Sequence, residues 1–352
     1  MISGSKARCA ITEISALWTV APYEVRIQPE KHKPLRPDDV VLTTRYSAIS
    51  HGTEMLVYRG QVPEGMSLDL PTFDGSFAFP IKYGYAVVGT VTALGSAVSG
   101  FAIGDSVFAL HPHQTQCTVQ QGLVHSIPTS VPLQAAVLSA NMETAINIVH
   151  DTRPAIGDVV VVIGLGVVGL LVAWLLARQS VHVIAVDPVA HRRTCAKQLG
   201  VPHVIHPDEA LALVRTISHQ RGADCVIEVS GNPQALPLAL DIVGQEGLIV
   251  VASWYGTKNV TLDLGSTFHR GRVRMRSSQV GHLAPDLAPR WDYARRMALV
   301  WELLAQFPYQ TVITHAYRFA DAARAYHDID QHQLPIIQTV LTYEHHTGAH
   351  HV

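Results

Sequence analysis

Apolar and polar residues follow two different rhythms along the chain, and the first of them extends over roughly the first 150 residues. Short apolar or alternating runs are separated there by Pro, Gly and Asp, and the clearest are 40–44, 85–94, 105–110 and 117–120. Runs of this length, bounded by turn residues, are typical of β-strands. A stretch of helical character at 134–150 leads into the next part of the chain. The pattern predicts a mostly β unit over residues 1–150.

From Asp158 onward, apolar runs of strand length alternate with stretches of helix length. Strands are expected at 159–163, 182–186, 224–228 and 247–252, and helices at 167–178 and 190–199. This alternation is typical of a doubly wound parallel sheet with helices on both faces. The sequence therefore predicts an α/β fold, with a domain boundary near residue 150.

The end of the chain has a third character. After about residue 285 the sequence becomes helical and charged, notably at 294–306, and a last β-like run lies at 336–341. Residues 346–352 are polar and rich in histidine, which favours a frayed tail over a metal site.

One uncharged stretch, 159–177, is long enough for a membrane-spanning helix. Its three glycines and the valine run before them favour instead a buried strand that turns into a helix. No apolar segment follows Lys6 and Arg8, so no secretory signal is expected. We therefore expect no membrane association.

Composition excludes several other classes of protein. With 48% apolar and 15% charged residues among 352, the chain is an ordinary globular sequence, neither disordered, collagen-like nor coiled-coil. Its formal net charge of −2 lacks the basic excess of a nucleic-acid-binding protein. Cys9, Cys117, Cys195 and Cys225 form no CxxC pair, which argues against structural zinc and disulfides. A reducing, cytoplasmic location fits this cysteine usage best.

A glycine-rich motif follows the first strand of the predicted parallel sheet. It consists of Gly164, Leu165, Gly166, Val167, Val168 and Gly169. In a GxGxxG turn the first glycine permits the tight turn, the second lets the backbone approach a pyrophosphate, and the third lets the helix pack on the strand. The N-terminus of the helix then offers free N–H groups to the phosphates. The order of strand, turn, helix and distal acid predicts dinucleotide binding.

The distal acid is Asp187, which ends the next strand 18 residues after Gly169. A carboxylate at that position accepts hydrogen bonds from the adenosine ribose and repels a 2′-phosphate, so NAD is favoured over NADP. His191, Arg192 and Arg193 follow closely. These residues either form a solvent-exposed first turn of the helix, which we favour, or pair with a 2′-phosphate. Arg192 is counted among the cofactor-binding candidates.

A β-rich unit followed by such a dinucleotide-binding unit resembles the medium-chain dehydrogenase/reductase superfamily over nearly the whole chain. Segments 46–60, 82–91, 253–256 and 276–280 are similar to its bacteriochlorophyllide dehydrogenase-like subgroup, which also contains alcohol dehydrogenases of unassigned substrate. The resemblance implies three parts of the chain. They are a GroES-like catalytic domain at 1–150 completed by 286–345, a Rossmann NAD-binding domain at 151–285, and the tail at 346–352.

The zinc ligands of the superfamily have poor counterparts in this chain. His51, or Ser50 with a different gap, stands where the zinc enzymes have a cysteine, and Tyr85-Ala86 replaces a His-Glu pair. Glu143 lies near the third ligand position. Since catalytic zinc requires three firm ligands, we predict no zinc.

Another possible ligand group lies at His111, His113 and Cys117, which offers two nitrogens and a sulfur but no visible fourth ligand. Histidines of a loop that flanks the substrate are the favoured interpretation, because the standard zinc spacing is missing.

Without a metal, side chains have to handle the proton of the substrate hydroxyl. The resemblance implies that Thr53 matches a hydroxyl residue that relays this proton. Tyr85 is expected to exchange a proton with the substrate oxygen, and His51 to titrate near neutral pH as the terminal base. Glu143 is a weaker candidate. Each has a plain structural alternative, such as a backbone hydrogen bond for Thr53.

The resemblance also places further side chains beside the cofactor. Ser253, Trp254, Ser277 and Ser278 are expected near the nicotinamide, and Ser230 near the adenosine ribose. Trp254 serves equally well as a core or interface residue.

Three functions remain open from the sequence. The first is an NAD-dependent oxidoreductase that interconverts a secondary alcohol and a ketone without zinc, as an expected homodimer. The second is a zinc-independent quinone or enoyl reductase that uses NADPH. The third is a dinucleotide-binding module that has lost catalysis, because a cofactor fold alone does not prove turnover.

Overall fold

A computed structural model of the chain describes residues 14–68, 72 and 75–344. The tail predicted at 346–352 lies outside these residues, as do Cys9 and the segment around Lys6 and Arg8.

The second half of the chain forms a six-stranded parallel sheet in the order β10-β9-β8-β11-β12-β13. Its strands are β8 (Val159–Ile163), β9 (His182–Val186), β10 (His203–Ile205), β11 (Ala223–Glu228), β12 (Val243–Val251) and β13 (Arg274–Ser277). The strand order reverses between β8 and β11, and ligands of such sheets bind at the carboxyl ends of the strands near that point. The predicted doubly wound parallel sheet is confirmed.

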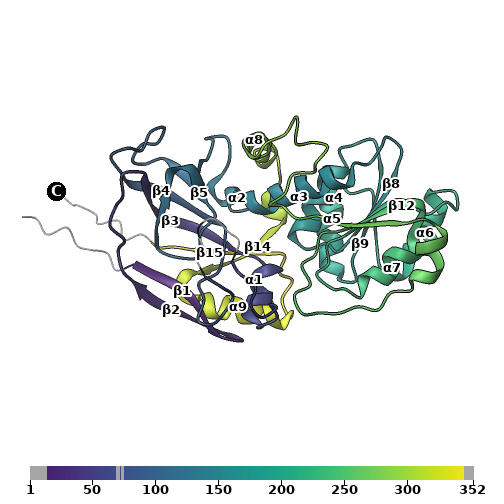
Figure 1. The fold of residues 1–352 in the computed structure, drawn as a ribbon, viewed down its shortest axis with the longest axis horizontal. Coiled ribbons are helices and arrows are strands. Elements are labelled where there is room, and N and C mark those ends of the chain that lie inside the picture. The colour runs from purple at the N-terminus through teal and green to yellow at the C-terminus, as the bar shows by residue number, and fades with distance from the viewer. Residues whose placement is uncertain (1–13, 69–71, 73–74, 345–352) are drawn as a thin grey trace, which may run out of the picture.

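Helices cover both faces of this sheet (Figure 1). They are α4 (Val167–Leu176), α5 (Ala190–Gln198), α6 (Ala210–Ile217) and α7 (Ala235–Ile242). Alternate residues of β8 belong to different cores: Val160 and Val162 pack with residues of α4, whereas Val159 and Val161 pack with residues of α6 and α7. Burial on both faces explains why the strand reads as an unbroken apolar run.

The other sheet has seven strands, with the order β14-β15-β3-β4-β5-β7 and β6 paired to β3. They are β3 (Asp39–Ile49), β4 (Val87–Leu94), β5 (Ser106–Ala109), β6 (Gln116–Gln120), β7 (Val124–Ser126), β14 (Ile313–Arg318) and β15 (Gln338–Thr342). A separate ribbon joins β1 (Ile14–Ala21) and β2 (Glu24–Glu30). Because β15 pairs antiparallel with β3, the end of the chain returns to complete the first sheet.

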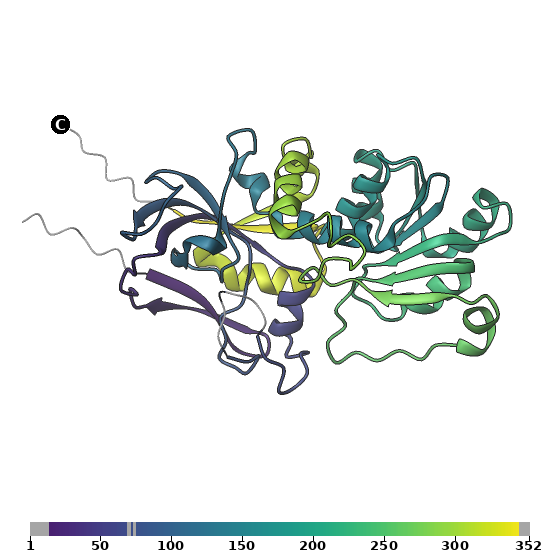
Figure 2. The ribbon, with the colours of Figure 1, turned by 45° about the horizontal axis from the view of Figure 1, so that its top comes forward.

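The remaining helices lie around this sheet and between the two sheets. They are α1 (Thr53–Tyr58), α2 (Leu133–Ala136), α3 (Ser139–Thr152), α8 (Tyr293–Leu304) and α9 (Ala322–Gln331). The two sheets lie side by side along the long axis of the molecule, with α3 between them (Figures 1 and 2). The boundary predicted at residue 150 falls inside α3, so the domain limits stay a prediction.

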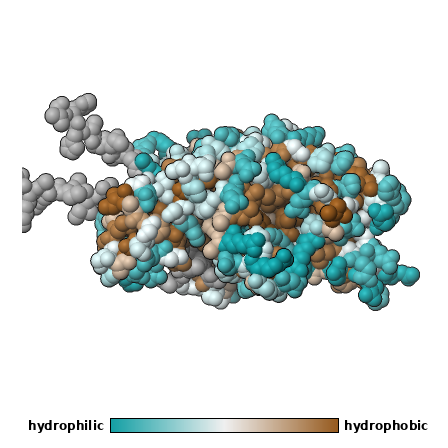
Figure 3. All heavy atoms as spheres, turned by 90° about the horizontal axis from the view of Figure 1, so that it is seen from above, coloured by the Kyte–Doolittle hydropathy of each residue, from teal (hydrophilic) through white to brown (hydrophobic). Residues whose placement is uncertain are grey.

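Residues 159–177 form β8, the glycine turn and α4, as the glycines indicated. Among the described residues, no helix is both long and apolar enough to cross a membrane. Hydrophilic and hydrophobic residues mix on the face seen from above, and hydrophobic ones gather near its middle (Figure 3).

Candidate active site

The glycine turn after β8 is shaped by close contacts that only glycine allows. Gly164 has a φ of +102°, and a Cβ there would lie 2.5 Å from the Cα of Ser230. A Cβ on Gly169 would lie 1.9 Å from the carbonyl oxygen of Gly164. At Gly166 a Cβ would meet no atom within 4 Å, so this glycine leaves room for a ligand rather than for the chain itself.

Asp187 is buried at the end of β9 and holds the turn in place. Its two oxygens accept hydrogen bonds from the N–H groups of Leu165 and Val189, each at 2.8 Å. The guanidinium Nη1 of Arg192 lies 3.6 Å from the same carboxylate. Arg192 therefore lies next to the acid that the sequence assigned to the adenosine ribose.

The carboxyl ends of β11 and β12 bring two more predicted residues together. Ser253 accepts a hydrogen bond from the N–H of Gly231 at 2.9 Å, directly beside Ser230. After β13 the outcome differs, because Ser277 is exposed while the hydroxyl of Ser278 donates to Asp151 of α3 at 2.7 Å. Contact of these serines with a nicotinamide stays a prediction.

These features fit a dinucleotide. Open space at Gly166 adjoins the N-terminus of α4, where Val167 and Val168 begin a helix whose first N–H groups lack intrahelical partners. The Nε2 of His191 and the Nε of Arg192 are buried polar atoms with no hydrogen-bond partner in the described protein. Buried polar groups are rarely left unsatisfied, so these two atoms beside Asp187 are available to a bound cofactor.

Tyr85, Ser50 and Thr53 meet at the end of the other sheet. Tyr85 precedes β4, and its hydroxyl donates to the Oγ of Ser50 at 2.5 Å. Burial and the nearby Glu54 carboxylate raise the pKa of Tyr85 to about 12, although hydrogen bonds with Ser50 and Thr53 act in the opposite direction. At neutral pH Tyr85 therefore keeps its proton and is a donor.

Beneath this group lies a buried hydrogen-bond network centred on Glu54. The carboxylate accepts from the N–H of Ser50 at 2.8 Å, and it contacts Nε2 of His113 at 2.9 Å and the hydroxyl of Tyr326 at 2.6 Å. His113 can approach because position 84 is glycine: a Cβ there would lie 2.7 Å from Nε2 of His113. The network ties α9 to the segment that carries Ser50 and Thr53.

We expect Glu54→Ala to destabilise the protein by about 3–5 kcal/mol, since it leaves His113 and Tyr326 buried without their acceptor. The midpoint of urea unfolding measures this loss. Glu64→Ala is the matched control, because Glu64 is exposed, and it should change stability by less than about 0.5 kcal/mol. Equal midpoints for the two variants would show that the network does not hold the fold.

His51 does not titrate near neutral pH, so that expectation was wrong. Burial, together with the nearby Arg192, His332, His315 and Arg59, lowers the pKa of His51 to about 3. Its Nε2 lies 3.3 Å from the Oγ1 of Thr339. His51 is thus a neutral hydrogen-bonding group at neutral pH, and a role in the chemistry stays a prediction.

Glu143 is engaged by Arg296, which was not among the residues expected at the site. One oxygen of Glu143 accepts from Nε and Nη2 of Arg296, at 3.0 and 2.8 Å. The buried guanidinium also donates to Asn147 at 2.7 Å and to the carbonyl of Val280 at 2.7 Å. Glu143 therefore joins α3 to α8 and is not free to act on a substrate in this arrangement.

The residues that the resemblance places at the zinc-ligand positions all have other partners among the described residues. Tyr85 bonds to Ser50, His51 contacts Thr339 and Glu143 is paired with Arg296. Across the part of the chain that the structure describes, no three His, Cys, Asp or Glu side chains gather into a metal-binding group.

Two members of the second possible ligand group, His113 and Cys117, are also committed elsewhere. The pair His113 and Glu54 is internal to the fold, and Cys117 is a buried thiol 3.7 Å from the hydroxyl of Thr44. Burial raises the pKa of that thiol to about 12, which disfavours the thiolate that a metal needs.

An aromatic strip connects Tyr85 with the parallel sheet. We use this name for Tyr85, Tyr83, Phe77 and Trp254, whose neighbouring ring centres are separated by 6.2, 5.4 and 5.7 Å. Trp254 follows β12, so the strip runs from one sheet to the other. Close by, Gly256 has a φ of +62°, and a Cβ there would lie 2.1 Å from the carbonyl oxygen of Gln61.

Several of these residues were missed by sequence reasoning. Ser50 was considered only as an alternative to His51, and Arg296 not at all. The sequence did carry one signal, because a lone Arg within the apolar face of a predicted helix suggests a buried partner.

Comparisons with known proteins agree with this architecture. The family model of the alcohol dehydrogenase GroES-like domain matches residues 36–131, and that of zinc-binding dehydrogenase matches residues 166–297. The chain is 27% identical over 348 residues to D-guloside 3-dehydrogenase of Escherichia coli (strain K12), which covers 93% of this chain and 99% of the relative. It is also 27% identical over 220 residues to sorbitol dehydrogenase of Bacillus subtilis (strain 168), covering 53% of this chain and 62% of the relative.

Among solved structures, 2R,3R-butanediol dehydrogenase from Bacillus subtilis superposes with a TM-score of 0.77 at 18% identity, covering 94% of this chain and 99% of that chain. This likeness concerns the fold alone.

Proposed function

Because the chain belongs to the medium-chain dehydrogenase/reductase superfamily and is therefore an oxidoreductase, we propose that it interconverts a secondary alcohol and a ketone by hydride transfer with NAD, without zinc. The observation that carries the proposal is that one chain holds both a proton donor and a cofactor site. The donor is the protonated Tyr85, and the cofactor site is the glycine turn with Asp187, which suit NAD. We also propose that the protein is a homodimer and lies in the cytoplasm.

The cofactor would be held by the residues that surround the empty space at Gly166. The first turn of α4 would bind the pyrophosphate, and Asp187 with Arg192 the adenosine ribose. Ser230, Ser253, Trp254, Ser277 and Ser278 are the proposed neighbours of its other groups. When bound, the nicotinamide supplies or accepts the hydride.

The proton of the reaction would pass through Tyr85. In ketone reduction the phenol donates its proton to the carbonyl oxygen, which becomes the hydroxyl of the product. Ser50 and Thr53 hold the phenol in position and stabilise the oxygen that has lost its proton. In alcohol oxidation the deprotonated phenol would accept the hydroxyl proton, and because the pKa of Tyr85 is raised to about 12, this direction should be favoured by high pH. Glu143 takes no part in this proposal, because Arg296 engages it.

A polyhydroxylated secondary alcohol is the proposed substrate class. The aromatic strip offers apolar ring faces beside Tyr85, on which the C–H face of a sugar or polyol can pack. The named activities of D-guloside 3-dehydrogenase and sorbitol dehydrogenase support this choice.

The proposal is tested by titrating one metal-analysed sample with NADH and NADPH, with fluorescence as the readout. Tight NADH binding with zinc well below one per chain, followed by turnover on a panel of polyols and glycosides, would support it. Stoichiometric zinc would refute zinc independence, and a preference for NADPH would favour a quinone or enoyl reductase. Light scattering of the same sample checks the homodimer.

Asp187→Ser should shift cofactor preference toward NADPH by about tenfold or more, because it removes the charge that repels a 2′-phosphate and leaves Arg192 free to pair with it. The ratio of the dissociation constants for NADH and NADPH measures the shift. Asp241→Ser, on an exposed position of α7, is the control with the same change in charge. An unchanged ratio in Asp187→Ser would exclude Asp187 as the selecting residue.

A further inference from the structure

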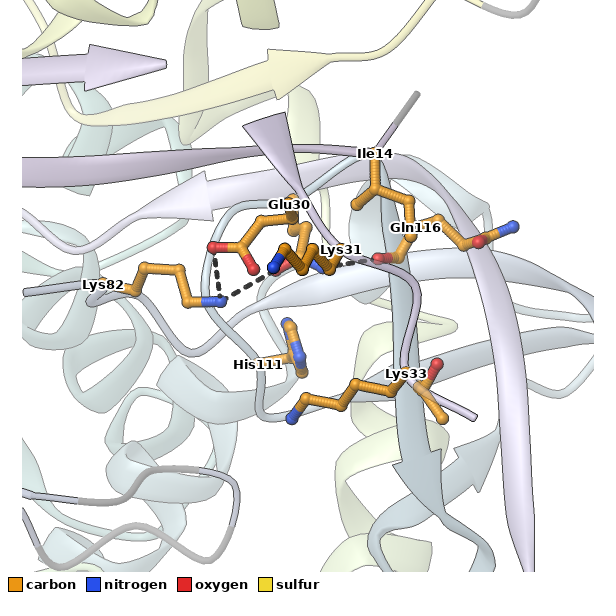
Figure 4. Close-up of a pocket in the computed structure, with 9 residues that line it drawn as sticks. Ile14, Glu30, Lys31, Lys33, Lys82, His111 and Gln116 are labelled. Atoms are coloured by element: carbon orange, nitrogen blue, oxygen red, sulfur yellow. Dashed lines mark hydrogen bonds and ion pairs between the residues drawn. The ribbon is translucent and has the colours of Figure 1, made fainter. Parts of the chain in front are cut away.

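A small cavity on the first sheet gathers cationic side chains that the proposed reaction does not use. It has a volume of about 30 Å³ and lies between the end of β2, strand β6 and the loop after β5. Its lining is Ile14, Glu30, Lys31, Lys33, Lys82, His111, Gln114, Gln116 and Thr118. We call it the lysine pocket. Figure 4 shows the ammonium ends of Lys31, Lys33 and Lys82 grouped around the ring of His111.

The single carboxylate in the lysine pocket is already engaged. Glu30 accepts a hydrogen bond from the indole N–H of Trp18 at 3.1 Å, and it forms an ion pair with Lys82 at 3.0 Å. Lys31 and Lys33 have no acidic partner among the described residues. The pocket therefore carries an excess of two positive charges, in a chain whose overall formal charge is −2.

The wall of the pocket is polar and fixed. His111 and Gln114 are 9% and 8% exposed. A hydrogen bond holds each side chain in place. His111 donates from Nδ1 to the carbonyl of Pro112 at 2.9 Å, and Gln114 donates to the carbonyl of Gln116 at 2.8 Å. Lys82 is held by Glu30 and also donates to the side-chain oxygen of Gln114 at 3.3 Å.

With Nδ1 of His111 carrying the proton, its Nε2 is an acceptor. Burial, together with Lys82 and Lys33, lowers the pKa of His111 to about 4, so this acceptor persists at neutral pH. A ligand that combines negative oxygens with one hydroxyl would satisfy both the ammonium groups and this nitrogen. Hydrogen phosphate is a ligand of that kind, and so is the singly protonated form of a phosphate monoester.

We propose that the lysine pocket binds a small phosphate-type oxyanion, with Lys31 and Lys33 as its main cationic partners. Its lining comes from β1, β2, β6 and the segments after β2, before β4 and after β5, and not from the glycine turn, so the pocket is separate from the dinucleotide site at Gly166. The ligand is either free phosphate or the phosphoryl end of a small metabolite, and the two sources share this chemistry.

The lysine pocket lies close in sequence to the candidate active site. Lys82 precedes Tyr85 by three residues, and His111 precedes His113 by two. An occupied pocket would fix the segment that leads into β4 and the segment that follows β5.

Calorimetric titration of the full chain with sodium phosphate, at constant ionic strength and with sodium chloride as the reference, tests the proposal. We expect saturable binding of one phosphate per chain at the pocket. The double variant Lys31→Gln/Lys33→Gln should bind about tenfold more weakly or worse, because it removes two charge-assisted hydrogen bonds. Lys197→Gln, an exposed lysine of α5, should bind as the unchanged protein does.

Both lysines are exposed, so the double variant is expected to fold, and its unfolding temperature confirms this. Phosphate affinity that is unchanged in the double variant would place the anion elsewhere, at the dinucleotide site for example, and would overturn the proposal. Absence of saturable heat with both inorganic phosphate and glucose 6-phosphate would do the same. Tighter binding of glucose 6-phosphate than of phosphate would identify a metabolite as the source.

Discussion

Replacing Tyr85 with phenylalanine is expected to lower kcat for ketone reduction by about 100-fold or more, because general acid catalysis contributes at least that much. The substitution removes the hydroxyl that donates to Ser50 and leaves the ring of the aromatic strip in place. Steady-state kinetics on the best ketone of the panel measure the loss, and fluorescence titration should give an unchanged dissociation constant for NADH.

Tyr23→Phe serves as the control, since Tyr23 is exposed and its loss of a hydroxyl should leave kcat unchanged. The pH profile gives a second readout. Because the pKa of Tyr85 is raised to about 12, its proton is available throughout the neutral range, and reduction should show no loss of rate up to about pH 10. A Tyr85→Phe enzyme that keeps kcat within about twofold would mean that another group is the acid.

The second large effect is expected at Gly166. A Gly166→Ala variant should fold normally, because the added Cβ meets no protein atom within 4 Å and the φ of −68° suits any residue. The methyl group would instead occupy the space left for the pyrophosphate, so NADH affinity should fall by about 100-fold. Fluorescence titration measures the affinity and thermal unfolding the stability.

Gly169→Ala gives the opposite combination. Its Cβ would lie 1.9 Å from the carbonyl oxygen of Gly164, so α4 has to move away from β8 and stability should fall by about 1–3 kcal/mol. If Gly166→Ala binds NADH as the unchanged protein does, the pyrophosphate does not lie over that glycine. The proposed cofactor site would then be wrong.

The parallel sheet could be predicted because its signals are local. β8 and β9 are buried on both faces and read as apolar runs, and the glycine turn carries its spacing in a few residues. β10 and β13 escaped prediction for the opposite reason. Both lie at an edge of the sheet, where polar residues such as His203 and Arg274 are accommodated and the apolar pattern fades.

The candidate active site could be predicted only in part. Thr53 and Tyr85 were named from the sequence, and the structure brings them together with Ser50. Their support depends on distant partners: Glu54 meets His113 59 positions away and Tyr326 272 positions away. No periodic pattern encodes such pairings. The lowered pKa of His51 has the same origin, because it depends on burial in the folded chain and then on the distant Arg192 of α5.

The ion pair between Glu143 and Arg296 also bears on attempts to engineer a metalloenzyme from this scaffold. His51→Cys and Tyr85→His would supply a thiolate and an imidazole, but Glu143 would still be bound to a guanidinium. Freeing it by removing Arg296 would leave Asn147 and the carbonyl of Val280 without their donor, and would loosen α8 from α3. Under the proposed zinc independence, a zinc site therefore cannot be built here by single neutral substitutions. Any such redesign has to rebuild the contact between α3 and α8 together with the ligands.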